Sequence, residues 1–124
     1  MLPLRFPWLW WALGWLLVAG VVFGSLLPGV PSISPSDKLM HFGAYFILMV
    51  WFAGLYSRER HFIVAALLLL LGFGLDLAQG ASPYRVFDWF DVAADAGGIL
   101  VGLLLSRFVL AGWCQRVERL LAAS

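Results

Sequence analysis

Four long apolar runs occupy most of this 124-residue chain. They lie at about residues 8–27, 37–56, 61–79 and 91–112, and each is close to the roughly 20 apolar residues that a helix needs to cross a bilayer. A helix satisfies its backbone polar groups internally, which the interior of a membrane requires. The sequence therefore predicts an all-α fold, a four-helix transmembrane bundle with short loops, in one domain covering residues 1–124.

The composition leaves no room for a soluble domain beside this bundle. Charged residues make up 12% of the chain, against the roughly 25% that is typical of soluble domains. The net charge is +1, so we expect no nucleic-acid partner. The single cysteine, Cys114, permits neither an internal disulfide nor a thiolate metal cluster, and nothing in the sequence indicates a cofactor.

Basic residues favour one orientation in the membrane. Positive charges in short loops mark the cytoplasmic side, and placing both termini there puts six basic residues inside and two outside. The six are Arg5, Arg58, Arg60, Arg107, Arg116 and Arg119. We therefore expect a multi-pass protein of the cytoplasmic (inner) membrane with both termini in the cytoplasm. The apolar and basic residues of the tail, 113–124, are arranged as in an interfacial amphipathic helix.

Most of the acidic residues then fall on the outer side, where the stretch 73–102 is the richest in polar residues. Asp76 and Gln79 lie three residues apart and share a face in the last turn of the third apolar run. Asp91 and Asp95 lie four apart and open the fourth run. Acids this deep in apolar segments are usually paired or line a watery cavity, which indicates a site.

The fourth run also carries a packing signal. Gly98 and Gly102 continue the face of Asp91 and Asp95, at spacings of three and four residues. Small residues four apart allow a neighbouring helix to approach closely. We expect helix packing at both glycines.

The second run contributes polar residues at a similar depth. Asp37, His41 and Tyr45 lie at positions i, i+4 and i+8, on one helix face near the outer end. We expect Asp37 to orient the His41 imidazole and Arg85 to pair with one or more acids. The predicted result is a shallow, outward-facing polar pocket. Its expected lining is Asp37, His41, Tyr45, Asp76, Gln79, Arg85, Asp91 and Asp95, with Lys38 as a further ligand-binding residue.

The same residues carry a family resemblance. The pattern from Asp37 to Tyr45, D-K-x-x-H-F-x-x-Y, resembles the signature of VanZ-like membrane proteins. That family continues with an acid and a Gln three apart, an Arg six later, an Asp six further on, and then N-x-x-G-x-x-x-G. The matching residues here are Asp76, Gln79, Arg85, Asp91, Asp95, Gly98 and Gly102.

The resemblance covers roughly residues 20–106 and has two departures. Asp76 stands where the family usually has Glu, and Asp95 where it usually has Asn. The resemblance implies an integral membrane protein of the bacterial cell envelope. The family is named for a protein associated with low-level resistance to the glycopeptide antibiotic teicoplanin, and it does not supply a biochemical reaction.

Three classes of function remain open. The first is non-enzymatic binding of a polar or anionic envelope head group, such as a lipid-linked wall precursor or an anionic lipid. The second is a membrane-embedded hydrolase or transferase acting on a lipid head group, with His41 or Asp76 as the general base. The third is a small cation- or proton-coupled carrier, which the apolar inner halves of the runs disfavour.

We expect no metal site, because the chain has no H-x-x-x-H or H-E-x-x-H pattern. The alternative is that His41 with two or three carboxylates holds a divalent cation. Asp88 is expected only to cap the fourth helix.

Overall fold

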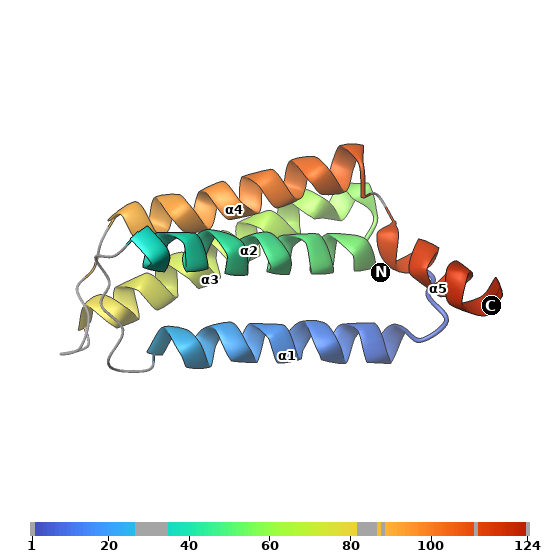
Figure 1. Ribbon diagram of the computed structural model, residues 1–124, viewed down its shortest axis with the longest axis horizontal. Helices are drawn as coiled ribbons and strands as arrows, with labels where there is room; N and C mark the ends of the chain where they lie inside the picture. Colours follow the sequence, from blue (N-terminus) through green and yellow to red (C-terminus); the bar gives the residue numbers. More distant parts are fainter. Residues whose placement is uncertain (1, 27–34, 82–86, 88, 111, 124) are drawn as a thin grey trace.

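The structure is a computed structural model that describes residues 2–26, 35–81, 87, 89–110 and 112–123 (Figure 1). Within these ranges the chain forms five α-helices and a short 3₁₀ turn, in the order α1 (Pro7–Leu26), α2 (Pro35–Leu55), η1 (Arg58–Arg60), α3 (His61–Ala81), α4 (Trp89–Phe108) and α5 (Trp113–Ala123). Helices α1 to α4 are each long and apolar enough to cross a membrane. The predicted all-α architecture is confirmed.

The helix boundaries follow the apolar runs closely, with one difference. The fourth run was expected to continue to about residue 112, but α4 ends at Phe108. There the Leu110 N–H binds the carbonyl of Leu105, five residues back, which widens the last turn. Gly112, at a φ of 67°, then turns the chain into the separate tail helix α5.

Helix α2 is the centre of the bundle, and its most extensive contact is with α4. Glycines on α4 permit this contact. A Cβ added to Gly98 would overlap the carbonyl oxygen of Phe42, and one added to Gly102 would lie 2.9 Å from Cβ of Met49. Both glycines therefore lie where α4 approaches α2 most closely.

The two ends of the bundle differ in what they hold (Figure 1). Both chain termini and α5 lie at one end, which we call the tail end. The opposite end, where α2 and α4 begin and α3 finishes, is here called the cluster end. Between them the interior is apolar, with Leu48, Met49 and Leu55 almost fully buried. Many outer side chains are large, apolar and exposed, as expected of surfaces that face lipid.

Three tryptophans from three helices meet at the tail end. The ring of Trp10 in α1 lies 5.5 Å, centre to centre, from those of Trp51 in α2 and Trp113 in α5. The Trp113 indole donates to the carbonyl of Val50 at 2.7 Å and packs directly on Gly54, which leaves no room for a side chain there. This tryptophan cluster fixes α5 against the first two helices.

Glu118 of α5 completes the tail end by capping the first helix. Its carboxylate accepts hydrogen bonds from the backbone N–H groups of Arg5 at 2.6 Å and Phe6 at 2.9 Å, and from the Trp10 indole at 2.8 Å. Because α1 begins at Pro7, the negative charge sits at the positive end of that helix. Burial acts to raise the pKa of Glu118, but these hydrogen bonds outweigh it and hold the pKa below its ordinary value.

Candidate functional site

Three polar side chains from three helices meet at the cluster end. His41 comes from α2, Asp76 from α3 and Asp95 from α4. The Nδ1 atom of His41 lies 2.8 Å from Oδ1 of Asp95 and 3.8 Å from Oδ1 of Asp76. We call these three residues the His–Asp cluster. The sequence-based expectation that residues of similar depth on different helices converge holds for all three.

Local sequence explains why the three can approach. Gly72 lies one turn before Asp76 on the same face of α3. A Cβ at Gly72 would come within 2.9 Å of Oδ2 of Asp95 and 3.2 Å of the Tyr45 ring. The missing side chain therefore gives α2 and α4 the space to bring these groups against α3. The sequence analysis missed Gly72, although its four-residue spacing from Asp76 was a usable signal.

Both acids of the cluster are buried. Asp76 is 2% exposed and Asp95 is 1% exposed. The second carboxylate oxygen of each, Oδ2, has no hydrogen-bond partner among the residues that the structure describes. Such atoms are uncommon in native proteins and call for an explanation. A buried carboxylate costs several kcal/mol unless an opposite charge, a proton or a full set of hydrogen bonds compensates it.

The His41–Asp95 contact sets the chemistry of the imidazole. Nδ1 of His41 lies 2.8 Å from Oδ1 of Asp95, so this hydrogen bond orients the imidazole and ties α2 to α4. The sequence analysis assigned this orienting role to Asp37, whose side chain lies outside the described residues. The partner that the structure describes comes from a different helix, which spacing along one helix does not reveal.

A second ion pair lies next to the cluster. Lys38 Nζ pairs with Oδ1 of Asp91, which is 1% exposed. Asp91 precedes Asp95 by four residues and Lys38 precedes His41 by three, so this pair links α2 to α4 about one turn closer to the end of the bundle.

Gln79, another predicted pocket residue, has a different partner. It is buried and donates to the carbonyl of Ser25 at 2.7 Å, so it binds one of the last carbonyls of α1. It therefore ties α3 to α1. Tyr45 is 3% exposed, with its ring between α2 and α3. The predicted sites at Arg85 and Asp88 lie outside the described residues.

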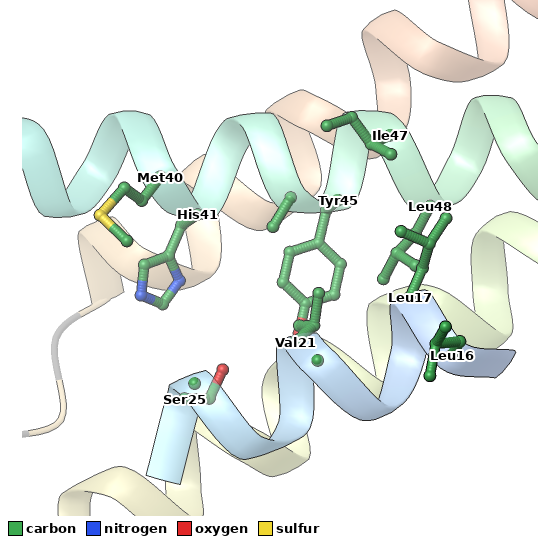
Figure 2. Close-up of a pocket in the computed structure, with 12 residues that line it drawn as sticks. Leu16, Leu17, Val21, Ser25, Met40, His41, Tyr45, Ile47 and Leu48 are labelled. Atoms are coloured by element: carbon green, nitrogen blue, oxygen red, sulfur yellow. The ribbon is translucent and has the colours of Figure 1, made fainter. Parts of the chain in front are cut away.

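A hollow of about 440 Å³ opens beside the cluster, between α1 and α2 (Figure 2). Its walls are mostly apolar, with Leu17 and Val21 on α1 facing Leu48 on α2. His41 and Tyr45 point from α2 toward α1 on this side. The predicted shallow polar pocket is thus divided in the structure, because the acids are buried behind His41 and the open space is largely apolar.

The polar groups of this hollow gather near its cluster end. Ser25 of α1 lines it together with His41 and Tyr45. The sequence analysis did not select Ser25, since a serine near the end of an apolar run carries no signal of its own. Gly20 and Gly24 also line the hollow, and neither would place a Cβ within 4 Å of another group. They keep the α1 wall open.

The fold defines a helical membrane protein with four candidate spans. A protein of Schizosaccharomyces pombe, itself described as uncharacterized, is 30% identical to this chain over 95 residues. The alignment covers 73% of this chain and 57% of the yeast protein, so the chain spans a little over half of that relative's length. No known family model matches the chain, and no solved structure matches it. The resemblance to VanZ-like proteins therefore stays a prediction.

Proposed function

We propose that this protein binds a lipid or lipid-linked molecule in the hollow between α1 and α2, with the polar head group at His41. The observation that carries the proposal is the continuity of an apolar hollow with a polar end. Apolar walls suit an acyl or isoprenoid chain, and a few convergent polar groups at one end suit its head group. The bilayer supplies such molecules at high local concentration.

Hydrogen-bonding groups at the cluster end support a polar head group. His41 is held by Asp95 and faces the hollow, while Lys38 lies on the same helix at the cluster end. Arg85, the remaining basic residue predicted for this end, would add a second positive charge. A phosphate-bearing head group would find hydrogen-bond donors here without having to enter the apolar interior.

The finer identity belongs to the same proposal. The resemblance to VanZ-like proteins would imply the membrane of a cell envelope. The distribution of basic residues favours both termini in the cytoplasm, which would make the cluster end face outward. A lipid-linked wall precursor or an anionic lipid would then be the ligand, and an altered response to teicoplanin a consequence. The uncharacterized fungal relative gives this finer part no support of its own.

The test is lipid retention by the purified protein. Protein in mild detergent is incubated with phosphatidylglycerol or phosphatidylcholine, and the retained lipid is counted by native mass spectrometry. We expect wild type to retain phosphatidylglycerol in preference to phosphatidylcholine. Gly20→Leu adds a side chain to the wall of the hollow, at a position with open space around its Cβ, and should abolish retention. Gly74→Leu, at an exposed glycine of α3 that also has open space around it, is the matched control.

Equal retention by wild type and Gly20→Leu would contradict the proposal. A response to teicoplanin in a host making the protein, lost in Gly20→Leu at matched membrane abundance, would support the finer part. No response with any variant would remove the finer part and leave lipid binding to stand on the retention data.

One observation favours a second candidate, a hydrolase or transferase. Ser25 and His41 line the same hollow, and Asp95 orients the imidazole of His41. A hydroxyl, a base and an orienting acid are the parts that nucleophilic catalysis needs. Ser25→Ala distinguishes the two candidates, because it should leave lipid retention intact and abolish any turnover of the retained lipid.

A further inference from the structure

The His–Asp cluster contains two buried acidic groups whose charge lipid binding in the hollow would not compensate. Asp76 and Asp95 place two acidic groups within a few ångströms of each other, both almost fully buried. Each has one carboxylate oxygen without a hydrogen-bond partner among the described residues. Lys38, the nearby described cation, is paired with Asp91. Two acids in this position require a compensating positive charge or bound protons.

The arrangement of atoms matches a metal site. One nitrogen of His41 and one oxygen from each of Asp76 and Asp95 all lie within 4.8 Å of one another. Ligand atoms that share one zinc ion at its usual bond lengths stand roughly 3.4 Å apart. The two contacts of His41 Nδ1, at 2.8 and 3.8 Å, bracket that spacing. Small side-chain rotations would therefore admit an ion.

We propose that His41, Asp76 and Asp95 bind one divalent first-row transition metal ion, with zinc as the best representative. Imidazole favours such metals, and carboxylates are acceptable partners for them. Two carboxylates would neutralise the ion, which removes the cost of burying them. Binding replaces the proton on Nδ1 of His41, which is released to solvent. Three protein ligands leave a further coordination position on the ion.

The metal site rests on the cluster alone and not on the lipid hollow. No metal site was expected from the sequence, because the chain has no H-x-x-x-H or H-E-x-x-H pattern. His41, Asp76 and Asp95 come from three helices, so no spacing motif can report them. The two proposals share only His41, which lines the hollow with one side of its ring and meets the acids with Nδ1.

The test is direct titration of the full-length protein in detergent with Zn²⁺ alone. Any affinity tag is removed and the protein is treated with chelator before calorimetry, and the metal content of untreated protein is measured by plasma mass spectrometry. We expect saturable binding of one ion per chain with release of protons. His41→Asn, Asp76→Asn and Asp95→Asn should each weaken binding at least about tenfold.

Asp91→Asn is the matched control, because it removes a buried acid on the same face of α4 that pairs with Lys38 instead. It should weaken zinc binding much less than the three cluster substitutions do, because Asp91 is not one of the proposed ligands. Thermal unfolding gives a second readout that does not require every variant to bind. Zinc should raise the unfolding temperature of wild type and Asp91→Asn but not of the three cluster variants.

Folded wild type that shows no saturable zinc binding would overturn the proposal and leave protons or Arg85 as the compensation. Binding that survives all three cluster substitutions would also overturn it, because the ion would then be held elsewhere. Lipid retention is measured without zinc, so loss of either property can be recognised separately.

Discussion

The two ends of the bundle both bury carboxylates, but they treat them differently. At the tail end, the carboxylate of Glu118 accepts hydrogen bonds from three N–H donors at the start of α1. These bonds compensate its charge and hold α5 against α1. At the cluster end, Asp76 and Asp95 each retain an oxygen with no partner among the described residues. The comparison separates an acid whose charge is compensated by the described fold from acids whose charge is not compensated by the described residues.

The surroundings support the same contrast. The tail end is closed by the tryptophan cluster, by Leu2 donating to the carbonyl of Leu55 at 2.7 Å, and by Gln115 donating to that of Pro3 at 2.9 Å. Burial there, and then the charge of Glu118, raise the pKa of the Cys114 thiol to about 12, which keeps it unreactive. The cluster end instead adjoins an open hollow. The simplest account is that the tail end stabilises the fold and the cluster end carries the candidate site.

The largest effect is expected from breaking the contact that builds the cluster end. Gly98→Ala would push a Cβ into the backbone of Phe42, where no side-chain rotation can relieve the overlap. We expect a loss of about 3 kcal/mol in the free energy of unfolding. Gly97→Ala is the control, since its Cβ would meet the Phe42 ring at an ordinary 3.4 Å. Unfolding in mixed micelles measures both, and equal stability of the two variants would show that close α2–α4 packing is not required.

A smaller loss, with a characteristic pH dependence, is expected at the tail end. Glu118→Gln keeps one acceptor oxygen but loses the charge and one charge-assisted hydrogen bond, so its unfolding temperature should fall. The folded-state pKa of Glu118 lies below its ordinary value of 4.5, so its stabilisation is complete above that pH and is lost as the pH falls through the folded-state pKa. The difference in unfolding temperature between wild type and Glu118→Gln should therefore shrink as the pH falls below 4.5. An advantage that does not change with pH would contradict the capping role.

The sequence was sufficient for the spans and for the depth at which polar groups gather. Hydropathy predicted the helices because each membrane span needs about 20 apolar residues. The spacing of Gly98 and Gly102 predicted the face of α4 that a neighbouring helix approaches closely. It also led to His41, Asp76 and Asp95, since polar side chains at one depth on packed helices can meet in the interior.

Contacts set by chain folding between distant segments were not predictable. Glu118 lies 113 residues from Arg5, and Trp113 meets Gly54 only because the tail folds back along the bundle. Trp10 packs against Trp51 and Trp113, which come from two other helices. His61, directly after the charged residues 58–60, is buried with Nε2 2.9 Å from the carbonyl of Ala53. Composition and residue spacing do not predict such long-range contacts.

The most direct measurement compares Asp95→Asn with Glu118→Gln in metal-free protein, by thermal unfolding in the same detergent. Asparagine preserves the shape of Asp95 and its acceptor for His41 while removing a poorly compensated charge. The account predicts that Asp95→Asn is as stable as wild type or more stable, whereas Glu118→Gln is less stable. If Asp95→Asn costs as much stability as Glu118→Gln, the acids of the cluster serve the fold, and the assignment of this end as the functional site is wrong.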